Sequence, residues 1–182
     1  QGNLDQFTFV WDLYISPSSN SGMQALWQGN DSNSNNAEFF LDFETGGFWL
    51  NDGTGAVGED LWPHGEWFRL VHRVDYTNDT SAIFVNGTKV LGDDELGAPD
   101  WLWCGNTDGI WLLSDDGPST QAGLVRCAHV AIVDLLVPDA SIEDLGGPDA
   151  RGIFIDRSEW RFDDENPADG VPLARSHGTS DL

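Results

Sequence analysis

The chain has 182 residues, of which 40% are hydrophobic and 12% aromatic, and this supply of apolar side chains suits the core of a single domain. Its 31 acidic residues outnumber 8 basic ones, so the formal net charge at pH 7 is −23. Such a surface repels phosphates and anionic membranes, which argues against nucleic acid and favours neutral glycans, cations, cationic polymers or other proteins as partners. No run approaches the ~20 apolar residues that a membrane-spanning helix needs, so we expect no membrane insertion. The chain begins at Gln1, directly before a strand-like run, as expected of a processed or excised chain.

Short strand-like runs recur along the chain about every ten residues. Each is rich in aromatic and β-branched residues, and clusters of Gly, Asn, Asp and Ser separate them. In chain order they cover 7–15, 24–27, 37–43, 47–51, 67–75 and 81–87, followed by WLWCG, GIWLLS and LVRCAHVAIVDLLV. This pattern predicts an all-β fold, either a sandwich or a barrel.

Two local motifs add detail to this prediction. Asn86-Gly87 stands between two strand-like runs, and both central residues of a type I′ turn need a positive φ, so we expect a tight hairpin there. Residues 138–145 form the one segment where a short C-terminal helix of one or two turns is expected, closed by Gly146.

A family resemblance rests on three parts of the sequence. GEWFRLVHRVD at 65–75 leads into SAIFVNGTKV at 81–90, AHVAIVDLLVPDASIEDLGG at 128–147 reads as a closing strand and short helix, and FTFVWDLYISP reads as a long first strand. In this order the chain resembles the laminin-G-like jelly-roll domains of the concanavalin A-like group. The resemblance implies a two-sheet antiparallel jelly-roll β-sandwich over residues 1–155. It also implies a secreted, extracellular module that binds carbohydrate or takes part in adhesion, without catalysis.

The many aromatic residues divide into expected core and candidate ligand contacts. The resemblance places four apolar residues on inward faces, three of them aromatic: Trp11, Trp67, Phe84 and Ile132. Sugar rings stack on exposed aromatic rings, and Trp62, in a loop, is the first candidate for such stacking. Trp101 and Trp103 share one strand face near Asn106 and Asp108, and this face is either core or a second binding platform.

The C-terminal segment 156–182 departs from the family pattern. The aromatic-Phe-Asp-Asp strand that usually opens such domains is absent at the front and appears as WRFDDENP at 160–167. Its strand-forming residues are Trp160, Phe162, Asp163 and Asp164. The segment either pairs within its own chain, or donates a strand to a neighbouring copy, or begins the next repeat of a tandem array. Donation between copies makes a self-assembling filament or lattice subunit the alternative function.

Calcium is the expected cofactor, because relatives of this fold hold it with loop carboxylates and carbonyls. The residues we expect to bind it are Asp108, Asp115 and Asp116, and two further acidic loops lie at 51–60 and 93–95. Cys104 and Cys127 fit either one disulfide or two buried thiols.

A glycoside hydrolase is the third and least favoured function. Glu38, Asp42 and Glu44 fall on one strand face, with Phe39, Leu41 and Phe43 on the other. Their spacing differs from the Glu-x-Asp-x-x-Glu arrangement of hydrolases with this fold, and a polar strand face beside a core face explains it equally well. We therefore expect no catalytic residue.

Overall fold

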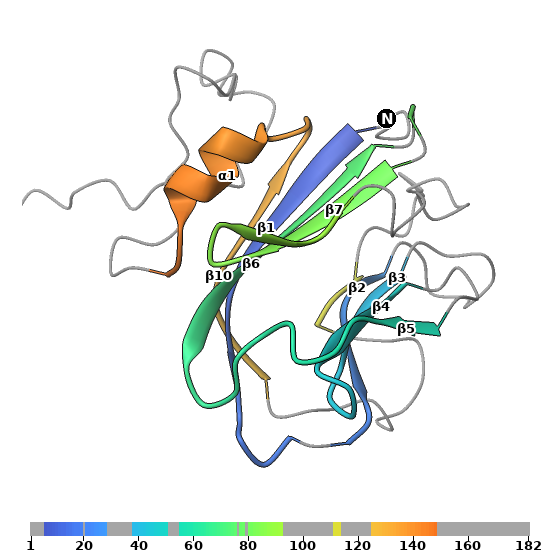
Figure 1. Cartoon of the computed structure of the whole chain (residues 1–182), viewed down its shortest axis with the longest axis vertical. Helices are drawn as coiled ribbons and strands as arrows, with labels where there is room; N and C mark the ends of the chain where they lie inside the picture. The colour runs from blue at the N-terminus through green and yellow to red at the C-terminus, as the bar shows by residue number, and fades with distance from the viewer. Residues whose placement is uncertain are drawn as a thin grey trace, which may run out of the picture.

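The computed structural model describes residues 6–19, 21–28, 38–50, 55–75, 77–78, 80–92, 111–113 and 125–148. Within these residues two antiparallel sheets pack face to face, and one short helix lies outside them (Figure 1). The all-β sandwich predicted from the sequence is confirmed.

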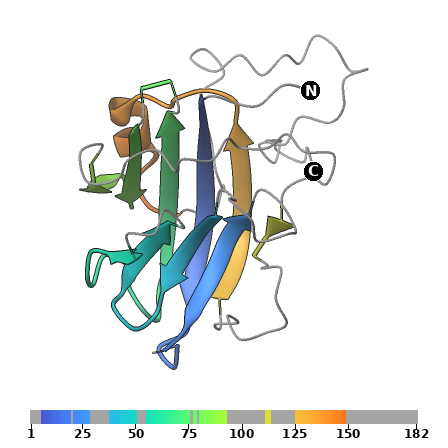
Figure 2. The same cartoon turned by 90° about the vertical axis from the view of Figure 1, so that its right-hand side faces the viewer.

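Each sheet has five strands in the described part of the chain. Sheet A has the order β10, β1, β6, β7, β8, with bounds Val125–Val133, Gln6–Ile15, Trp67–Asp75, Thr80–Val85 and Thr88–Leu91. Sheet B has the order β5, β4, β3, β2, β9, with bounds Gly55–Val57, Gly47–Leu50, Glu38–Asp42, Met23–Gln28 and Trp111–Leu112. Figure 2 shows the two sheets as layers, with β10 and β9 toward the same side.

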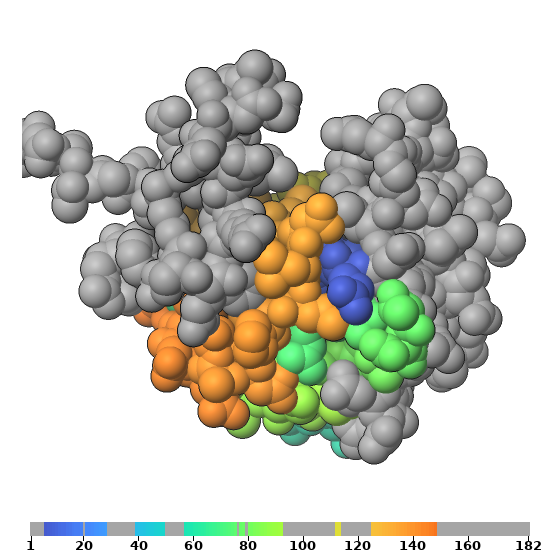
Figure 3. Space-filling view, turned by 90° about the horizontal axis from the view of Figure 1, so that it is seen from above, coloured from blue at the N-terminus to red at the C-terminus, as the bar shows by residue number. Residues whose placement is uncertain are grey.

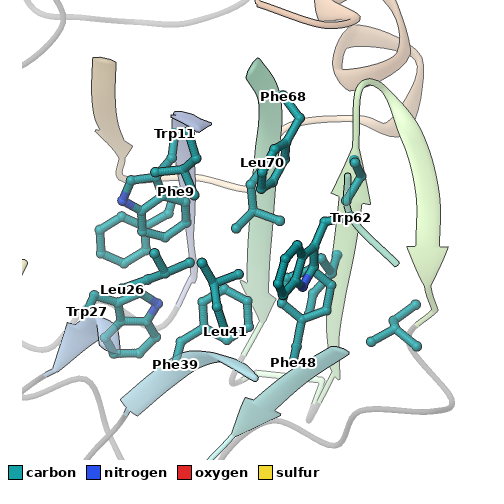
Figure 4. Close-up of a cluster of buried hydrophobic side chains, with 14 of the residues drawn as sticks. Phe9, Trp11, Leu26, Trp27, Phe39, Leu41, Phe48, Trp62, Phe68 and Leu70 are labelled. Carbon is teal, nitrogen blue, oxygen red and sulfur yellow. The ribbon is translucent and has the colours of Figure 1, made fainter. Parts of the chain in front are cut away.

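The space between the sheets is filled by aromatic and branched side chains (Figure 4). Every second residue of β1 points inward, and Phe9 stacks both on Trp11, at 4.7 Å between ring centroids, and on Trp27 of the opposite sheet, at 5.3 Å. Burying one such side chain stabilises the fold by about 1.5–3 kcal/mol. The buried members of this core are Phe7, Phe9, Trp11, Leu13, Ile15, Leu26, Trp27, Phe39, Leu41, Phe43, Phe48, Trp62, Phe68, Leu70, Val74, Ile83, Val85 and Leu91.

The predicted hairpin and helix are both present. Asn86 and Gly87 have φ of 51° and 80°, as a type I′ turn requires, and they join β7 to β8. Helix α1 covers Asp139–Leu145 and is followed by Gly146 at φ 54°.

Helix α1 packs on the outer face of sheet A and closes a second apolar cluster. Its members are Val10, Val71, Ala82, Phe84, Ala131, Val133, Val137 and Ile142. In the space-filling view the orange atoms of this C-terminal part lie beside the blue start of β1 and green atoms of the sheet (Figure 3). Asp139 joins the helix to the sheet through ion pairs with Arg73 and with Lys89, whose Nζ is 2.7 Å from Asp139 Oδ2.

Of the four residues expected on inward faces, two are confirmed and two are corrected. Trp11 is fully buried between the sheets, and Ile132 packs against the same core. Phe84 is buried, but beneath α1 on the outer face of sheet A. Trp67 is wrong as a core residue: its side chain is 44% exposed. Strand alternation explains this, because Phe68 and Leu70 take the inward positions of β6.

Candidate functional site

Trp62, the first candidate for sugar stacking, lies in the core. It is 4% exposed, and its Nε1 donates a hydrogen bond to the Gly47 carbonyl at 3.0 Å. Its ring stacks on Phe68 at 6.3 Å and has His64 at 4.7 Å. A sugar needs an open ring face, so the structure contradicts the assignment of Trp62 as a ligand residue.

The other residues named as ligand contacts lie outside the described residues. These are Trp101, Trp103, Asn106 and Asp108, the further calcium candidates Asp115 and Asp116, and the strand residues Trp160, Phe162, Asp163 and Asp164. Their roles stay predictions. In the described part of the chain no group of three His, Cys, Asp or Glu side chains is arranged to hold a metal ion, and no helix is long and apolar enough to cross a membrane.

The acidic strand face considered for catalysis has a structural use. Phe39, Leu41 and Phe43 are buried on the core side of β3, as predicted. On the turn that follows, Asp42 Oδ1 accepts a hydrogen bond from the Glu44 backbone N–H at 2.9 Å. This contact holds the turn into β4, which is an ordinary role for Asp at such a position.

The outer face of sheet A is organised in rows that run across β10, β1 and β6. Cross-strand pairing places Val10 beside Val71 and Ala131, and this apolar row lies under α1. Two further rows lie toward the end of β1, and they contain the charged and aromatic groups of this face.

The first of these rows is a buried ion network. Asp12 receives two hydrogen bonds from Arg69, Nε to Oδ1 at 2.7 Å and Nη2 to Oδ2 at 2.9 Å, with both side chains 2% exposed. The Nδ1 atom of His129 is 3.1 Å from Asp12 Oδ2. Arg69 Nη1 also donates to the carbonyl of Leu145, the last residue of α1, at 3.0 Å. The network therefore joins three strands to the end of the helix.

Cys127 lies in β10 close to this network. It is a free thiol whose Sγ donates to the His129 carbonyl at 3.2 Å. Burial, with a further contribution from the negative charge of Asp12, raises the pKa of the thiol to about 11. At neutral pH Cys127 is thus protonated and a poor nucleophile.

The last row consists of Tyr14, Trp67 and Arg126, which we call the outer platform. Trp67 and Arg126 are exposed, and Tyr14 between them is half-buried. Tyr14 on β1 pairs with Trp67 on β6 and with Arg126 on β10. The Tyr14 and Trp67 rings are 5.7 Å apart, and the Arg126 guanidinium carbon lies 5.5 Å from the Tyr14 ring centroid. Three strands thus hold two aromatic rings and a cation next to one another on one surface.

The outer platform carries a positive charge on a strongly acidic protein. Arg126 is exposed, and no acidic side chain of the described residues forms an ion pair with it. In contrast, Arg69, Arg73 and Lys89 on the same face are each held by an Asp. A planar guanidinium such as that of Arg126 matches a carboxylate in a bidentate arrangement.

Sequence reasoning missed the outer platform because it assigned Trp67 to the core. The signal was present in the alternation of β6, where Trp67 shares its face with Arg69 and Arg73 and not with Phe68 and Leu70. A strand face with two arginines faces away from the core. Tyr14 and Arg126, by comparison, become neighbours only through the pairing of β1 with β10.

No family model matches this sequence, and no curated protein matches it. Solved structures do match. The CBM40 domain of the Ruminococcus gnavus IT-sialidase, bound to α2,3 sialyllactose, has a TM-score of 0.57 at 15% identity, with 80% of this chain and 84% of that chain covered. A second structure of the same CBM40 domain gives a TM-score of 0.56 at 16% identity.

A second group of matches consists of Trypanosoma rangeli sialidase structures. The complex with 2,3-difluoro-KDN has a TM-score of 0.55 at 13% identity, and it covers 77% of this chain but only 22% of the sialidase chain. This chain therefore spans about a fifth of the sialidases that it matches. At these identities the similarity establishes a shared β-sandwich fold.

Proposed function

We propose that this chain is a non-catalytic carbohydrate-binding module whose glycan binds on the outer platform. The observation that carries the proposal is the Trp67 ring, 44% exposed, beside Tyr14 and Arg126, which has no ion-pair partner among the described residues. An exposed indole supplies the flat apolar surface that the C–H face of a sugar requires, and strands hold it in place. We place the module outside the cell, as an accessory to a larger secreted protein.

The ligand class that fits the outer platform is a sugar bearing a single carboxylate. A carboxylate held by Arg126 would bring the sugar ring against Tyr14 and Trp67, since Tyr14 is the direct cross-strand neighbour of both Arg126 and Trp67. The sialyllactose in the Ruminococcus gnavus CBM40 structure supports this class, because that domain shares the fold over most of its length. The net charge of −23 disfavours long polyanions, which would meet many acidic side chains.

The make-up of the outer platform also supports a binding role without catalysis. Glycoside hydrolysis generally needs two carboxyl groups that flank the scissile bond, and Tyr14, Trp67 and Arg126 supply none. The CBM40 domain is matched over 84% of its length, whereas the sialidases are matched over 22% of theirs.

Replacing Trp67 with alanine is expected to weaken binding of sialyllactose at least about tenfold, or ~1.4 kcal/mol, because the stacking surface is lost. Arg126→Ala is expected to reduce affinity for sialyllactose to that for lactose, which lacks the carboxylate. Isothermal titration with the two sugars measures both effects. Parallel titrations with calcium and with a chelator test whether the expected cofactor contributes.

Lys89→Ala is the matched control for Arg126→Ala. It also removes one positive charge from the same face of sheet A, but Lys89 is bound to Asp139 and lies beside α1. We expect this variant to bind sialyllactose as the unmodified chain does. If Trp67→Ala binds sialyllactose with unchanged affinity, the outer platform is not the glycan site. Trp101 and Trp103 are then the next residues to test.

A further inference from the structure

One side of the sandwich has two strand edges next to each other in the described part of the chain. Phe9 of β1 stacks on Trp27 of β2, so these strands face each other across the core. Phe39 of β3 stacks on His72 of β6 at 4.2 Å, so β3 faces β6. The other neighbour of β1 is β10, and the other neighbour of β2 is β9. These two strands must therefore lie together on the side of the sandwich away from β6 and β3, as Figure 2 shows.

The two edges differ greatly in length, and apolar side chains are exposed between them. β10 has nine residues whereas β9 has two. Val130 pairs with the inward-facing Trp11 and Leu112 pairs with the inward-facing Trp27, so both point toward the core side of their sheets. Nevertheless Val130 is 38% exposed and Leu112 is 36% exposed, and Leu113 next to it is 37% exposed. We call Val130 and Leu112 the open seam.

The open seam needs a strand of a particular kind to cover it. A strand added to the edge of β10 would satisfy the backbone N–H and C=O groups that face away from β1. To cover the open seam as well, it needs large apolar side chains at alternate positions and polar ones between them. An uncovered long edge beside apolar side chains is a site at which β-proteins associate.

We propose that residues 158–164 of the same chain form this strand on the edge of β10. In Trp160-Arg161-Phe162-Asp163 the two aromatic residues alternate with two charged ones. When Trp160 and Phe162 face the open seam, Arg161 and Asp163 face solvent. The pairing closes the sandwich with a strand that comes last in the sequence.

The length of the intervening chain permits this pairing. Gly147 lies against the Asn86 side chain, at the turn that joins β7 and β8. From β7 to a strand beyond β10 there are four strand spacings in sheet A, or about 19 Å at ~4.8 Å each. Residues 149–157 reach about 30 Å when extended. A second copy of the chain is thus not required to supply the strand.

Hydrogen exchange of the full-length protein, read by mass spectrometry on peptides from β10, tests the proposal. About half of the β10 amides face β1 and about half face the edge. In the unmodified chain we expect both halves to be protected. In Trp160→Ser with Phe162→Ser the edge-facing half is expected to exchange at least about tenfold faster, because the apolar contacts that hold the added strand are gone. β6, which lies inside sheet A, should exchange equally in both proteins and shows that the variant is folded.

The matched control is Arg161→Ser with Asp163→Ser, which makes the same number of changes on the opposite face of the strand and should leave β10 protected. Adding a synthetic peptide of residues 158–166 to the Trp160→Ser, Phe162→Ser protein should restore protection. Equal exchange of β10 in the unmodified chain and this variant would overturn the proposal. Light scattering distinguishes the source of the strand: a 20.0 kDa particle supports pairing within one chain, and larger particles that the double variant dissociates would overturn it in favour of donation between copies.

Discussion

Asp12→Ala is expected to lower the free energy of unfolding by about 3–5 kcal/mol, which is a large part of the stability of a domain of this size. The reason is the position of Arg69, which is 2% exposed and keeps two hydrogen bonds to the Asp12 carboxylate. Without Asp12 the buried guanidinium loses both of these charge-assisted hydrogen bonds. Urea unfolding followed by tryptophan fluorescence measures the change.

Two further variants test whether the loss of stability comes from the buried charge of Arg69 or from lost side-chain packing. Asp12→Leu combined with Arg69→Met removes both charges and should recover most of the loss, because an apolar pair of similar size needs no counter-ion. Asp139→Ala breaks ion pairs whose Asp is 43% exposed, and we expect a loss below about 1 kcal/mol. Equal losses in Asp12→Ala and in the double variant would show that side-chain packing, and not charge burial, explains the effect.

Acidification from pH 7.5 to pH 5 is expected to destabilise the fold through His72 by about 2 kcal/mol. His72 is fully buried between the sheets, where its Nδ1 accepts a hydrogen bond from Trp27 Nε1 at 3.4 Å and its ring stacks on Phe39. Its Nε2 has no hydrogen-bond partner within the described residues. Burial of the ring lowers the pKa of His72 from 6.5 to about 3.

The sign follows from which state binds the proton. Between pH 6.5 and about 3 the unfolded chain protonates His72 and the folded chain does not, so stability falls as the pH decreases through this range. The slope approaches about 1.4 kcal/mol per pH unit. For Asp139, burial acts to raise the pKa, but hydrogen bonds from Lys89 and Arg73 outweigh it and lower the pKa below 3.8. The Asp139 contribution is therefore lost only at more acid pH than the measurement uses.

His72→Gln tests the origin of this pH dependence. Glutamine keeps an acceptor for Trp27 Nε1 but does not titrate, so the difference in stability between pH 7.5 and pH 5 should shrink by about 2 kcal/mol whatever the baseline stability of the variant. His64→Gln is the control, because it makes the same substitution at an exposed histidine outside the core. If the free energy of unfolding of His72→Gln still falls as much between pH 7.5 and pH 5, another titrating group causes the pH dependence.

The sequence was sufficient wherever a local rule decides the structure. The Asn86-Gly87 turn follows from its need for positive φ, α1 from its bounding Pro138 and Gly146, and the buried face of β3 from the alternation of Phe39 and Leu41. These features depend on residues within a few positions of one another.

The candidate site was harder to predict because it depends on long-range pairing. Trp62 looked like an exposed loop residue, yet its hydrogen bond to Gly47 and its stacking on Phe68 place it in the core. Trp67 belongs to an apolar run, and only the alternation of side chains along β6 places it on the surface. That Tyr14 lies beside Arg126 is a consequence of strand register, which short-range patterns do not determine.

The place of β1 in the middle of sheet A has a consequence for how the chain is made. β1 ends at Ile15 and its partner β10 begins at Val125, a separation of 110 residues by subtraction of these bounds. A ribosome needs on the order of 5–20 s to translate that stretch. During this interval a nascent chain presents Phe7, Phe9 and Trp11 with one hydrogen-bonding edge unfilled. The 31 acidic residues spread along the sequence provide mutual repulsion between such nascent chains, so the excess of negative charge opposes their aggregation during synthesis.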